Sequence, residues 1–368
     1  MFDFVVGLGQ GGGRLAKTFH EGMGIPLVVM NLAGIDVAHM GLAKNERLVF
    51  EHGGTGRDPE FGEQIATDRL TDLQSFLRRR GKVYVEGQSV LVTVGGGGGA
   101  GTGFMFPVLE ALLQDEKQVF LIFTLPEKRE GLPTKPNALK ALDRLIKEYV
   151  QKERISILLV ENDFCVQRYG RSDKGNYWNS VNVGIVTSLK RFHVLTELER
   201  FSEFIDVSAG YKALDANDLK RILFAKNGYI DLRRIVFSEP VTEDGGLMRA
   251  IRESSLIFGS LDIRTTKQYV VSLGIPMSWK GKSWASAFVE DVFNAVSKAT
   301  RHAPLVIRTS YYNSKLTDLQ VHILLSGMAR SKGIDKMIRG TEKDQQRLED
   351  RKGVDRLDLN SMVKKSRK

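Results

Sequence analysis

Glycine-rich runs stand at two points of the chain where main-chain groups could bind an anion. The longer run, Gly95–Gly103, has the sequence GGGGGAGTG and directly follows the apolar run Ser89–Val94. Glycine has no Cβ, so its N–H groups can approach a phosphate closely, and a helix that starts there adds the positive end of its dipole. The hydroxyl group of Thr102 could donate a further hydrogen bond. A flexible linker would also be rich in glycine, but apolar runs bound this segment on both sides, so we predict a phosphate-binding loop.

The first glycine run, Gly7–Gly13, has the sequence GLGQGGG and follows the apolar run Phe2–Gly7. It fits the dinucleotide-binding pattern G-x-G-x-x-G only imperfectly, and that pattern is a weak signal when it stands alone. Neither run is followed by the lysine of a P-loop, so a P-loop NTPase is not expected.

A pair of carboxylates, Asp215 and Asp218, lies in the segment LDANDL. Two acids at this spacing can orient a water molecule for hydrolysis. The same spacing is common where one acid caps a helix and a second acid lies in its first turn. The residue types alone leave both interpretations open.

Length and composition limit the class of protein. The chain has 368 residues, of which 42% are hydrophobic and 27% are charged, as in folded water-soluble proteins with two or three domains. No apolar stretch approaches the roughly 18 residues of a membrane span, and the first residues lack the basic segment of a secretory signal. The single cysteine, Cys165, excludes an internal disulfide and suits a reducing compartment. We therefore expect a cytoplasmic protein that does not bind membranes.

Apolar runs alternate with helix-like segments in the first half of the chain. Near-continuous apolar runs separated by helices indicate a parallel sheet covered on both faces, in a Rossmann-like α/β fold. Ligands of such sheets bind at the carboxyl ends of the strands, where both glycine runs lie. The expected strands are Phe2–Gly7, Pro26–Asn31, Ser89–Val94, Val119–Thr124 and Ile155–Val160, and the expected helices are Phe61–Arg80, Phe104–Leu113 and Asn137–Gln151.

The second half begins with a long central helix, expected over Asn179–Phe201, and a helix over Asp215–Lys226. Later apolar runs predict a smaller C-terminal α/β domain, followed by a charged helical tail. Its expected strands are Arg234–Phe237, Ser254–Phe258, Gln268–Leu273, Pro304–Thr309 and Gln320–Leu325, and its expected helix is Trp284–Thr300. The predicted units are a nucleotide-binding domain at 1–178, a central region at 179–229, a C-terminal domain at 230–328 and a tail at 329–368.

The order of these motifs resembles the tubulin and FtsZ superfamily of polymerising GTPases. A GQGG loop after the first strand is followed about 90 residues later by a glycine run that ends in GTG, as in the tubulin signature. Between them, Gly54–Gly62 is similar to the third nucleotide loop of FtsZ, and Pro126–Gly131 is similar to the loop that contacts the ribose. Val160–Asp163 ends a strand where the family places an asparagine near the sugar and base. The resemblance covers about residues 1–325.

The resemblance implies that GTP or GDP with Mg²⁺ binds the glycine loops, and it assigns no side chain as a metal ligand. It implies that LDANDL is the synergy loop, whose acids Asp215 and Asp218 enter the nucleotide site of the next subunit. Hydrolysis would then wait for head-to-tail assembly, because neither subunit alone holds a complete site. The residues that the resemblance places at the nucleotide are Gly9, Gln10, Gly11, Gly12, Asn31, Gly56, Gly97, Gly98, Gly99, Ala100, Gly101, Thr102, Gly103, Glu130, Asn162, Asn176 and Asn179.

Several positions depart from the FtsZ pattern. Ala213 stands two residues before the first acid, and Arg14 follows the first loop, where FtsZ commonly has asparagine. Thr134 or Lys135 stands where FtsZ has an arginine. These departures leave the base contacts open, and the candidates are Asn162, Asn176 and Asn179, with Tyr177 or Trp178 as a stacking ring.

The GQGG loop and the basic end are most similar to the TubZ-type proteins of plasmids and phages. That similarity implies a filament for DNA segregation whose C-terminal tail binds a DNA-bound adaptor. The formal net charge is +10, and residues 331–368 carry +5 of it. The tail contact would use Lys364, Lys365, Arg367 and Lys368, and it would weaken with salt. A solvated, frayed end is the simpler interpretation of the same charges.

Three alternatives stay open. The first is an FtsZ-like filament for cell division or for phage positioning. The second is a Rossmann-type dinucleotide enzyme, which needs an acid at the end of the second strand, where Asn31 stands, and leaves the second glycine run unexplained. The third is a nucleotide-binding adaptor without hydrolysis, which would not need Asp215 and Asp218.

Overall fold

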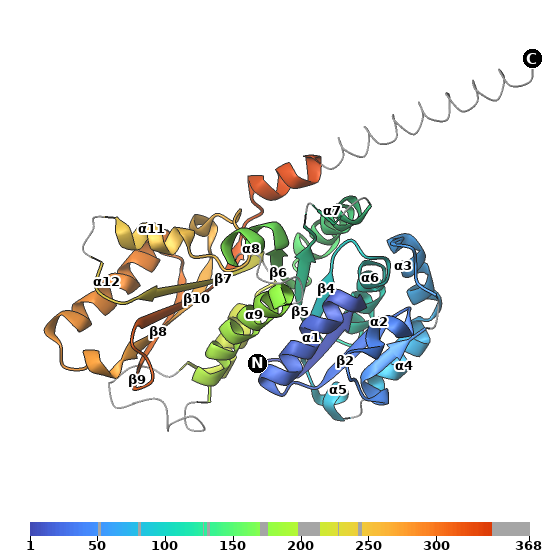
Figure 1. The fold of residues 1–368 in the computed structure, drawn as a ribbon, viewed down its shortest axis with the longest axis horizontal. Coiled ribbons are helices and arrows are strands. Elements are labelled where there is room, and N and C mark those ends of the chain that lie inside the picture. Colours follow the sequence, from blue (N-terminus) through green and yellow to red (C-terminus); the bar gives the residue numbers. More distant parts are fainter. Residues whose placement is uncertain are drawn as a thin grey trace, which may run out of the picture.

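The structure is a computed structural model, and it describes residues 1–50, 53–79, 82–127, 129–130, 133–169, 176–197, 214–226, 228–241 and 245–340. Within these residues, ten strands form one sheet that runs along the molecule in the order β3-β2-β1-β4-β5-β6-β7-β10-β8-β9 (Figure 1). The strands are β1 (Phe4–Leu8), β2 (Leu27–Asn31), β3 (Arg47–Val49), β4 (Ser89–Gly95), β5 (Gln118–Leu125), β6 (Ser156–Glu161), β7 (Tyr229–Phe237), β8 (Gln268–Pro276), β9 (Leu305–Asn313) and β10 (Leu319–Met328).

Strands β1 to β6 are all parallel. Every residue of β1 and β2 is buried, which explains why their sequences are apolar throughout rather than alternating. Because β1 lies between β2 and β4, the order of the strands reverses there, and the carboxyl ends of β1 and β4 form the switch point where ligands of such sheets bind. The predicted Rossmann-like parallel sheet is confirmed.

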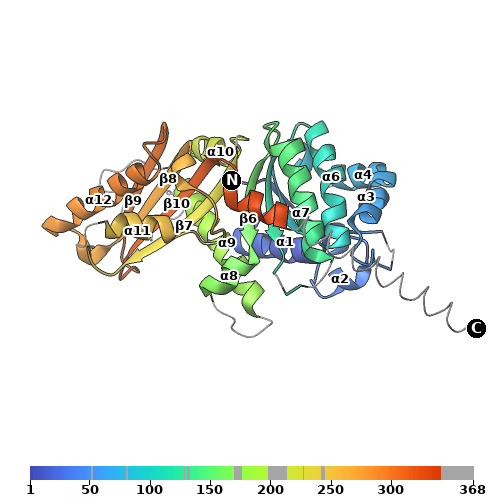
Figure 2. The same ribbon diagram turned by 90° about the horizontal axis from the view of Figure 1, so that it is seen from above.

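Helices cover both faces of this half of the sheet (Figure 2). They are α1 (Gly9–Met23), α2 (Gly34–Ala38), α3 (Pro59–Asp68), α4 (Leu70–Arg78), α5 (Lys82–Glu86), α6 (Gly99–Gln114), α7 (Thr134–Leu145), α8 (Asn162–Tyr169) and α9 (Asn176–Leu195). α1 packs against α9 on one face, and α6 packs against α3, α4 and α7 on the other. None of the helices in the described ranges is long and apolar enough to cross a membrane.

Several helices differ in their bounds from the prediction, among them α7, which begins at Thr134 rather than at Asn137. α6 begins at Gly99, five residues before the expected start, because its first turn consists of small residues that carry no apolar period. The helix expected over Phe61–Arg80 is two helices, since the backbone of Arg69 leaves the helical region (φ −106°, ψ 20°) while the apolar stripe continues through the break. α9 begins at Asn176 rather than Asn179, and the predicted end at Phe201 lies outside the described residues.

The C-terminal half extends the same sheet. β7 pairs in parallel with β6 at Ile157 and Leu158, and antiparallel β10 then joins it to the parallel pair of β8 and β9. The helices of this half include α10 (Ala216–Leu223), α11 (Gly246–Glu253) and α12 (Ser283–Ala299), and residues 332–340 are helical as well. The prediction of a strand over Ser254–Phe258 is wrong, because this segment forms only an isolated bridge from Ser255 to Arg233. α11 was not expected.

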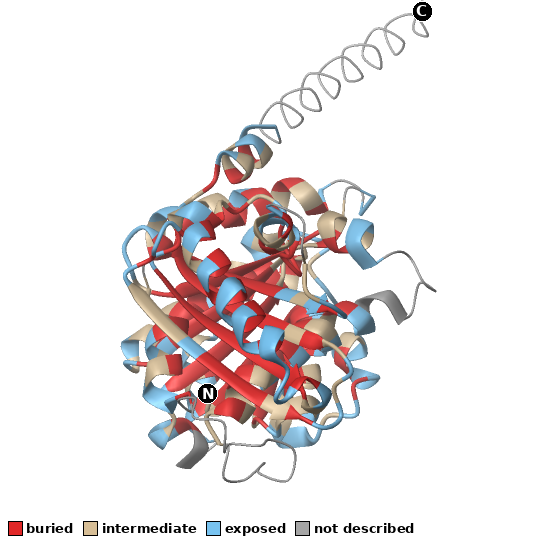
Figure 3. Ribbon diagram, turned by 90° about the vertical axis from the view of Figure 1, so that its left-hand side faces the viewer, coloured by how far each residue is buried: buried red, intermediate tan, exposed pale blue. Residues whose placement is uncertain are grey.

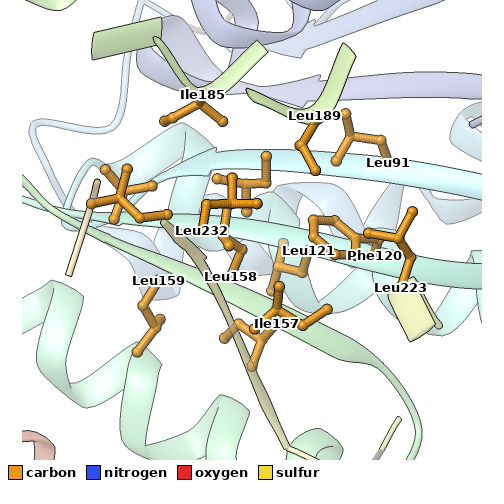
Figure 4. Close-up of a cluster of buried hydrophobic side chains, with 14 of the residues drawn as sticks. Leu91, Phe120, Leu121, Ile157, Leu158, Leu159, Ile185, Leu189, Leu223 and Leu232 are labelled. Atoms are coloured by element: carbon orange, nitrogen blue, oxygen red, sulfur yellow. The ribbon is translucent and has the colours of Figure 1, made fainter. Parts of the chain in front are cut away.

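Buried residues run along the sheet through both halves (Figure 3), and side chains from both halves meet beside α9 (Figure 4). Ile185 and Leu189 of α9 lie against β4, β5 and β6, and Leu232 of β7 reaches the same cluster. The members of the cluster are at most 1% exposed and include Leu91, Phe120, Leu121, Ile157, Leu158, Ile185, Leu189, Leu223 and Leu232. Packing on this scale fixes α9 against the parallel strands.

Cys165 is buried in α8, with its Sγ 3.8 Å from the carbonyl oxygen of Ile257. Burial raises the pKa of its thiol to about 12, and the carboxylate of Glu161 adds to this effect. The thiolate that a nucleophilic cysteine needs is therefore scarce near neutral pH.

Candidate nucleotide-binding site

The two glycine runs meet backbone to backbone at the carboxyl ends of β1 and β4. A Cβ added to Gly9, whose φ is +68°, would lie 2.8 Å from the backbone nitrogen of Gly101. A Cβ added to Gly101 would lie 2.8 Å from the carbonyl oxygen of Leu8. Because real Cβ atoms do not approach other atoms so closely, both positions require glycine, and the runs together form a floor of bare main chain.

α3 supports the longer glycine run from outside. A Cβ on Gly99 would lie 1.6 Å from Oγ1 of Thr55, and one on Gly103 would lie 2.6 Å from the carbonyl oxygen of Pro59. Asp58 caps α3, because its side chain accepts hydrogen bonds of 2.9 and 3.2 Å from backbone N–H groups of the first turn. The third loop of the sequence analysis is thus the segment that seats α3 on the glycine run.

Thr102 lies inside the loop. Its side chain is 1% exposed, and its Oγ1 accepts a hydrogen bond of 2.8 Å from the backbone nitrogen of Gly97, whose φ is +89°. Neither residue lines the cavity. The groups that face an anion are therefore the N–H groups at the start of α6, in Gly99, Ala100 and Gly101, which have no partner within the helix.

A cavity of about 840 Å³ opens above this floor, a size that suits a nucleotide. Asn179, Gly12 and Gly103 do not line it, whereas most of the other predicted positions do. The predicted residues in its wall are Gly9, Gln10, Gly11, Asn31, Gly56, Gly98, Gly99, Ala100, Gly101, Glu130 and Asn162. Asn176 starts α9, and its side chain lies outside the described part.

Arginines in the cavity wall supply positive charge that the sequence analysis did not assign to phosphates. They are Arg14, Arg57 and Arg129. Arg57 is held in a left-handed conformation with φ +68°, where Nδ2 of Asn137 donates a hydrogen bond of 2.8 Å to its carbonyl oxygen. Together with the positive end of α6, Arg57 would complement a polyphosphate.

Asn31 ends β2 at the cavity and is fully buried. Its Oδ1 accepts a hydrogen bond of 2.8 Å from the backbone nitrogen of Leu32, whereas its Nδ2 has no hydrogen-bond partner among the described residues. A buried amide donor without a partner is costly, so a ligand that accepts from Nδ2 would gain affinity.

Glu130 lies in a turn with Glu127, whose backbone nitrogen donates to its Oε1 at 3.1 Å. Desolvation raises the pKa of the Glu130 carboxyl, and the carboxylates of Glu127 and Asp163 act in the same direction. The carboxyl oxygens of Glu130 can accept hydrogen bonds from the hydroxyl groups of a ribose.

The residues of α9 that line the cavity differ from those predicted. Val181, Asn182 and Ile185 line the cavity, whereas Asn179 is exposed elsewhere on the helix. Asn182 lies about one turn after Asn179. The sequence alone does not fix the rotation of α9 about its axis, so it did not indicate which residues of the helix line the cavity.

The acids of α10 lie at the opposite end of the parallel strands from the cavity. Phe224, directly after α10, packs against Phe2 and Phe120, which lie at the amino ends of β1 and β5. At about 3.3 Å per residue, strands of five to eight residues separate the two ends by roughly 17–26 Å. Asp215 and Asp218 therefore cannot serve the cavity of their own chain.

Both acids are accessible from outside. Asp215 caps α10, since its Oδ1 accepts from the backbone nitrogens of Asn217 and Asp218 at 2.7 and 3.2 Å. Asp218 lies in the first turn, where its side chain is 41% exposed and pairs with Arg221 at 3.0 Å. Asp215 is thus a helix cap, and Asp218 lies in the first turn, as the capping interpretation states. Both carboxylates are at the surface, so they can also contact another molecule.

Comparisons with known proteins support this picture. No family model matches the chain. It is 26% identical over 365 residues to the tubulin-like protein CetZ of Thermococcus kodakarensis, a match that covers 92% of this chain and 85% of the relative. It is 30% identical over 168 residues to the cell division protein FtsZ 1 of Archaeoglobus fulgidus, which covers 43% of this chain and 41% of that protein.

The crystal structure of a GTPγS-form protofilament of TubZ from Bacillus thuringiensis serovar israelensis has the same fold. Its TM-score is 0.77 at 18% identity, and the match covers 96% of this chain and 94% of that one. Fold, glycine floor and relatives agree: the chain is similar in sequence to tubulin/FtsZ superfamily proteins over 92% of its length, and it has their fold. The relatives found by sequence are named CetZ and FtsZ, whereas the Bacillus protofilament is formed by a TubZ. A TubZ-type role for this chain is therefore a proposal.

Proposed function

We propose that the chain is a GTPase that polymerises head to tail and cleaves GTP between subunits. The observation that carries this proposal is that the cavity and the two acids lie at opposite ends of the parallel strands. The cavity opens at the carboxyl ends of the strands, and Asp215 and Asp218 lie exposed at the amino ends. Stacking one subunit on the next would bring the acids of one to the cavity of the other.

In this proposal the phosphates lie on the first turn of α6 and the ribose lies near Glu130. Backbone N–H groups and Arg57 would hold the charged oxygens, and Asn31 would donate its unpaired Nδ2 hydrogen. These groups are positioned by packing before a ligand arrives, so little ordering would be needed on binding.

Mg²⁺ would arrive with the nucleotide. This ion usually keeps several water molecules and is held by phosphate oxygens with one or two carboxylates. Asp36 lines the cavity, and the described residues contain no cluster of three or more His, Cys, Asp or Glu side chains that could hold a metal alone. The cavity thus fits a metal shared with phosphates. The ion would neutralise charge on the phosphates.

Cleavage of GTP needs an in-line water and stabilisation of the charge on the γ-phosphate, with little covalent chemistry from the protein. Asp218 of the neighbouring subunit would accept a hydrogen bond from that water and orient it, and Asp215 would add negative charge beside it. Hydrolysis would then follow assembly.

Polymerisation that depends on the nucleotide tests the proposal. With GTP or a slowly hydrolysed GTP analogue, we expect the chain to sediment and to form filaments in electron micrographs, and with ATP we expect it to stay in the supernatant. Phosphate release should accompany sedimentation with GTP and not with the analogue. Binding of NAD without binding of GTP would instead favour a dinucleotide enzyme.

We further propose a TubZ-type role in the segregation of plasmid or phage DNA. Support comes from the fold shared with a TubZ protofilament and from the basic end of the sequence. The cations concerned, Lys364, Lys365, Arg367 and Lys368, lie outside the described residues. They would contact a DNA-bound adaptor and its DNA. An FtsZ-like filament in cell division or phage positioning is the alternative.

Removal of residues 364–368 should leave sedimentation with GTP unchanged and weaken the binding of filaments to DNA. Labelled duplex DNA of mixed sequence is the probe, and its co-sedimentation is measured between about 50 and 200 mM salt. Because four cations are lost, the slope of log affinity against log salt should fall by up to about 4. Equal affinity and equal slope for both chains would assign these cations no part in DNA binding.

A further inference from the structure

We propose that Arg14 reads the guanine base, by donating two hydrogen bonds to its O6 and N7 atoms. This inference rests on the proposed function, because it takes the phosphates to lie on the first turn of α6. It assigns a role in specificity to Arg14, a cation that belongs to none of the sequence motifs.

The packing of α1 against α9 places Arg14 in the part of the cavity wall that these two helices form. A Cβ on Gly22 would lie 2.7 Å from Cγ1 of Val186, and Nζ of Lys190 donates a hydrogen bond of 2.7 Å to the carbonyl oxygen of Gly22. Residues four apart share a helix face, so Arg14 lies on the same stripe of α1 as Gly22, and Asn182 lies on the same stripe of α9 as Val186.

Both helices begin beside the cavity, and Arg14 and Asn182 both line it. The two stripes therefore face each other, with one polar side chain on each at the cavity. Val181 and Ile185, which are 3% and 1% exposed, add an apolar wall between them. An apolar wall with polar groups at its edge suits a planar base.

Arg14 is available to a ligand. Its side chain is exposed in the cavity, and it has no hydrogen bond or ion pair within the described residues. Lys17, the next cation on α1, does not line the cavity and pairs with Glu21. A cation that is left unpaired beside an apolar wall can bind a partner that only accepts hydrogen bonds.

The chemistry of the guanidinium selects the base. Arginine only donates, and guanine offers two adjacent acceptors, O6 and N7, that match its planar fork. Adenine presents an amino group in place of O6, so it would lose one bond and oppose donor to donor. The side-chain oxygen of Asn182 can accept hydrogen bonds from the N1 and N2 groups of guanine. Arg14 would thus bind O6 and N7, and Asn182 would bind the N1 and N2 edge.

Binding of GTP analogues to dilute monomer tests the proposal. In 7-deaza-GTP a carbon replaces N7, and in ITP the N2 amino group is missing. We expect the wild-type chain to bind 7-deaza-GTP about tenfold more weakly than GTP, the range for a charged hydrogen bond. Arg14→Met loses both hydrogen bonds, so it should bind GTP about a hundredfold more weakly and bind GTP and 7-deaza-GTP equally, while the ratio of ITP to GTP affinity should match that of the wild type.

Lys17→Ala is the matched control, because it removes a positive charge from the same helix at a position outside the cavity. It should keep wild-type affinities for all three nucleotides. If the wild-type chain binds GTP but does not discriminate against 7-deaza-GTP, or if Arg14→Met keeps that discrimination, the role of Arg14 is overturned while the proposed function stands. If the wild-type chain binds no guanine nucleotide, the proposed function itself fails.

Discussion

Asp218→Ala lowers the rate of GTP hydrolysis in filaments by about 10²- to 10⁴-fold, the usual contribution of a side chain that handles a proton in the transition state. Binding of GTP by the monomer should stay unchanged, because Asp218 lies at the amino ends of the strands and the cavity lies at the carboxyl ends. Filaments of the variant should also last longer, since GTP inside them is not cleaved. The measurements are phosphate release and light scattering after addition of GTP.

Arg221→Ala is the matched control for this variant. It removes the same ion pair, from Nη2 of Arg221 to Oδ1 of Asp218 at 3.0 Å, but keeps the carboxylate. Asp215→Asn separates charge from capping, because asparagine caps a helix about as well as aspartate. We expect near wild-type turnover from Arg221→Ala and slow turnover from Asp215→Asn. Normal hydrolysis by Asp218→Ala filaments would remove Asp218 from the proposed site.

Asp231→Ala destabilises the folded chain by about 3–5 kcal/mol, a large part of the total stability of a domain. Asp231 and Arg233 lie on the same face of β7, are 0% and 3% exposed, and pair at 2.8 Å. Nη1 of Arg233 also donates to the carbonyl oxygens of Ile251 and Arg252, each at 2.7 Å. Loss of Asp231 leaves a buried guanidinium without its counter-charge. Urea unfolding measures the change in free energy.

Two further variants separate burial from charge in that experiment. Glu60→Ala breaks an ion pair with Lys140 whose side chains are 78% and 70% exposed, so it should cost at most about 0.5 kcal/mol. The double replacement Asp231→Leu with Arg233→Met removes both charges and should lie within about 2 kcal/mol of the wild type. Equal unfolding free energies for Asp231→Ala and Glu60→Ala would contradict the buried pair.

The parallel strands were predictable because each is buried along its whole length. Such strands have continuous apolar runs, and the glycines that follow β1 and β4 mark their carboxyl ends. The start of α6 was not predictable from the apolar period. Its glycines are helical because they pack against Leu8 and Pro59, which lie far from them in the sequence.

In the C-terminal half, a contact between residues distant in the sequence explains why one strand prediction is wrong. Ser254–Phe258 has the apolar composition of a strand, but its polar groups are occupied otherwise: Oγ of Ser255 donates to Asp231 at 2.7 Å. No local pattern contains that contact. In the same way, Asn182 belongs to the cavity only because α1 and α9 pack face to face, which fixes the rotation of α9.

Dilution of the wild-type chain tests most directly whether two subunits share one site. The rate of phosphate release per subunit is measured at saturating GTP over a series of protein concentrations. We predict a rate near zero below a threshold concentration and a rate that rises above it, in step with filament mass. A rate per subunit that stays constant through the whole series would contradict the account.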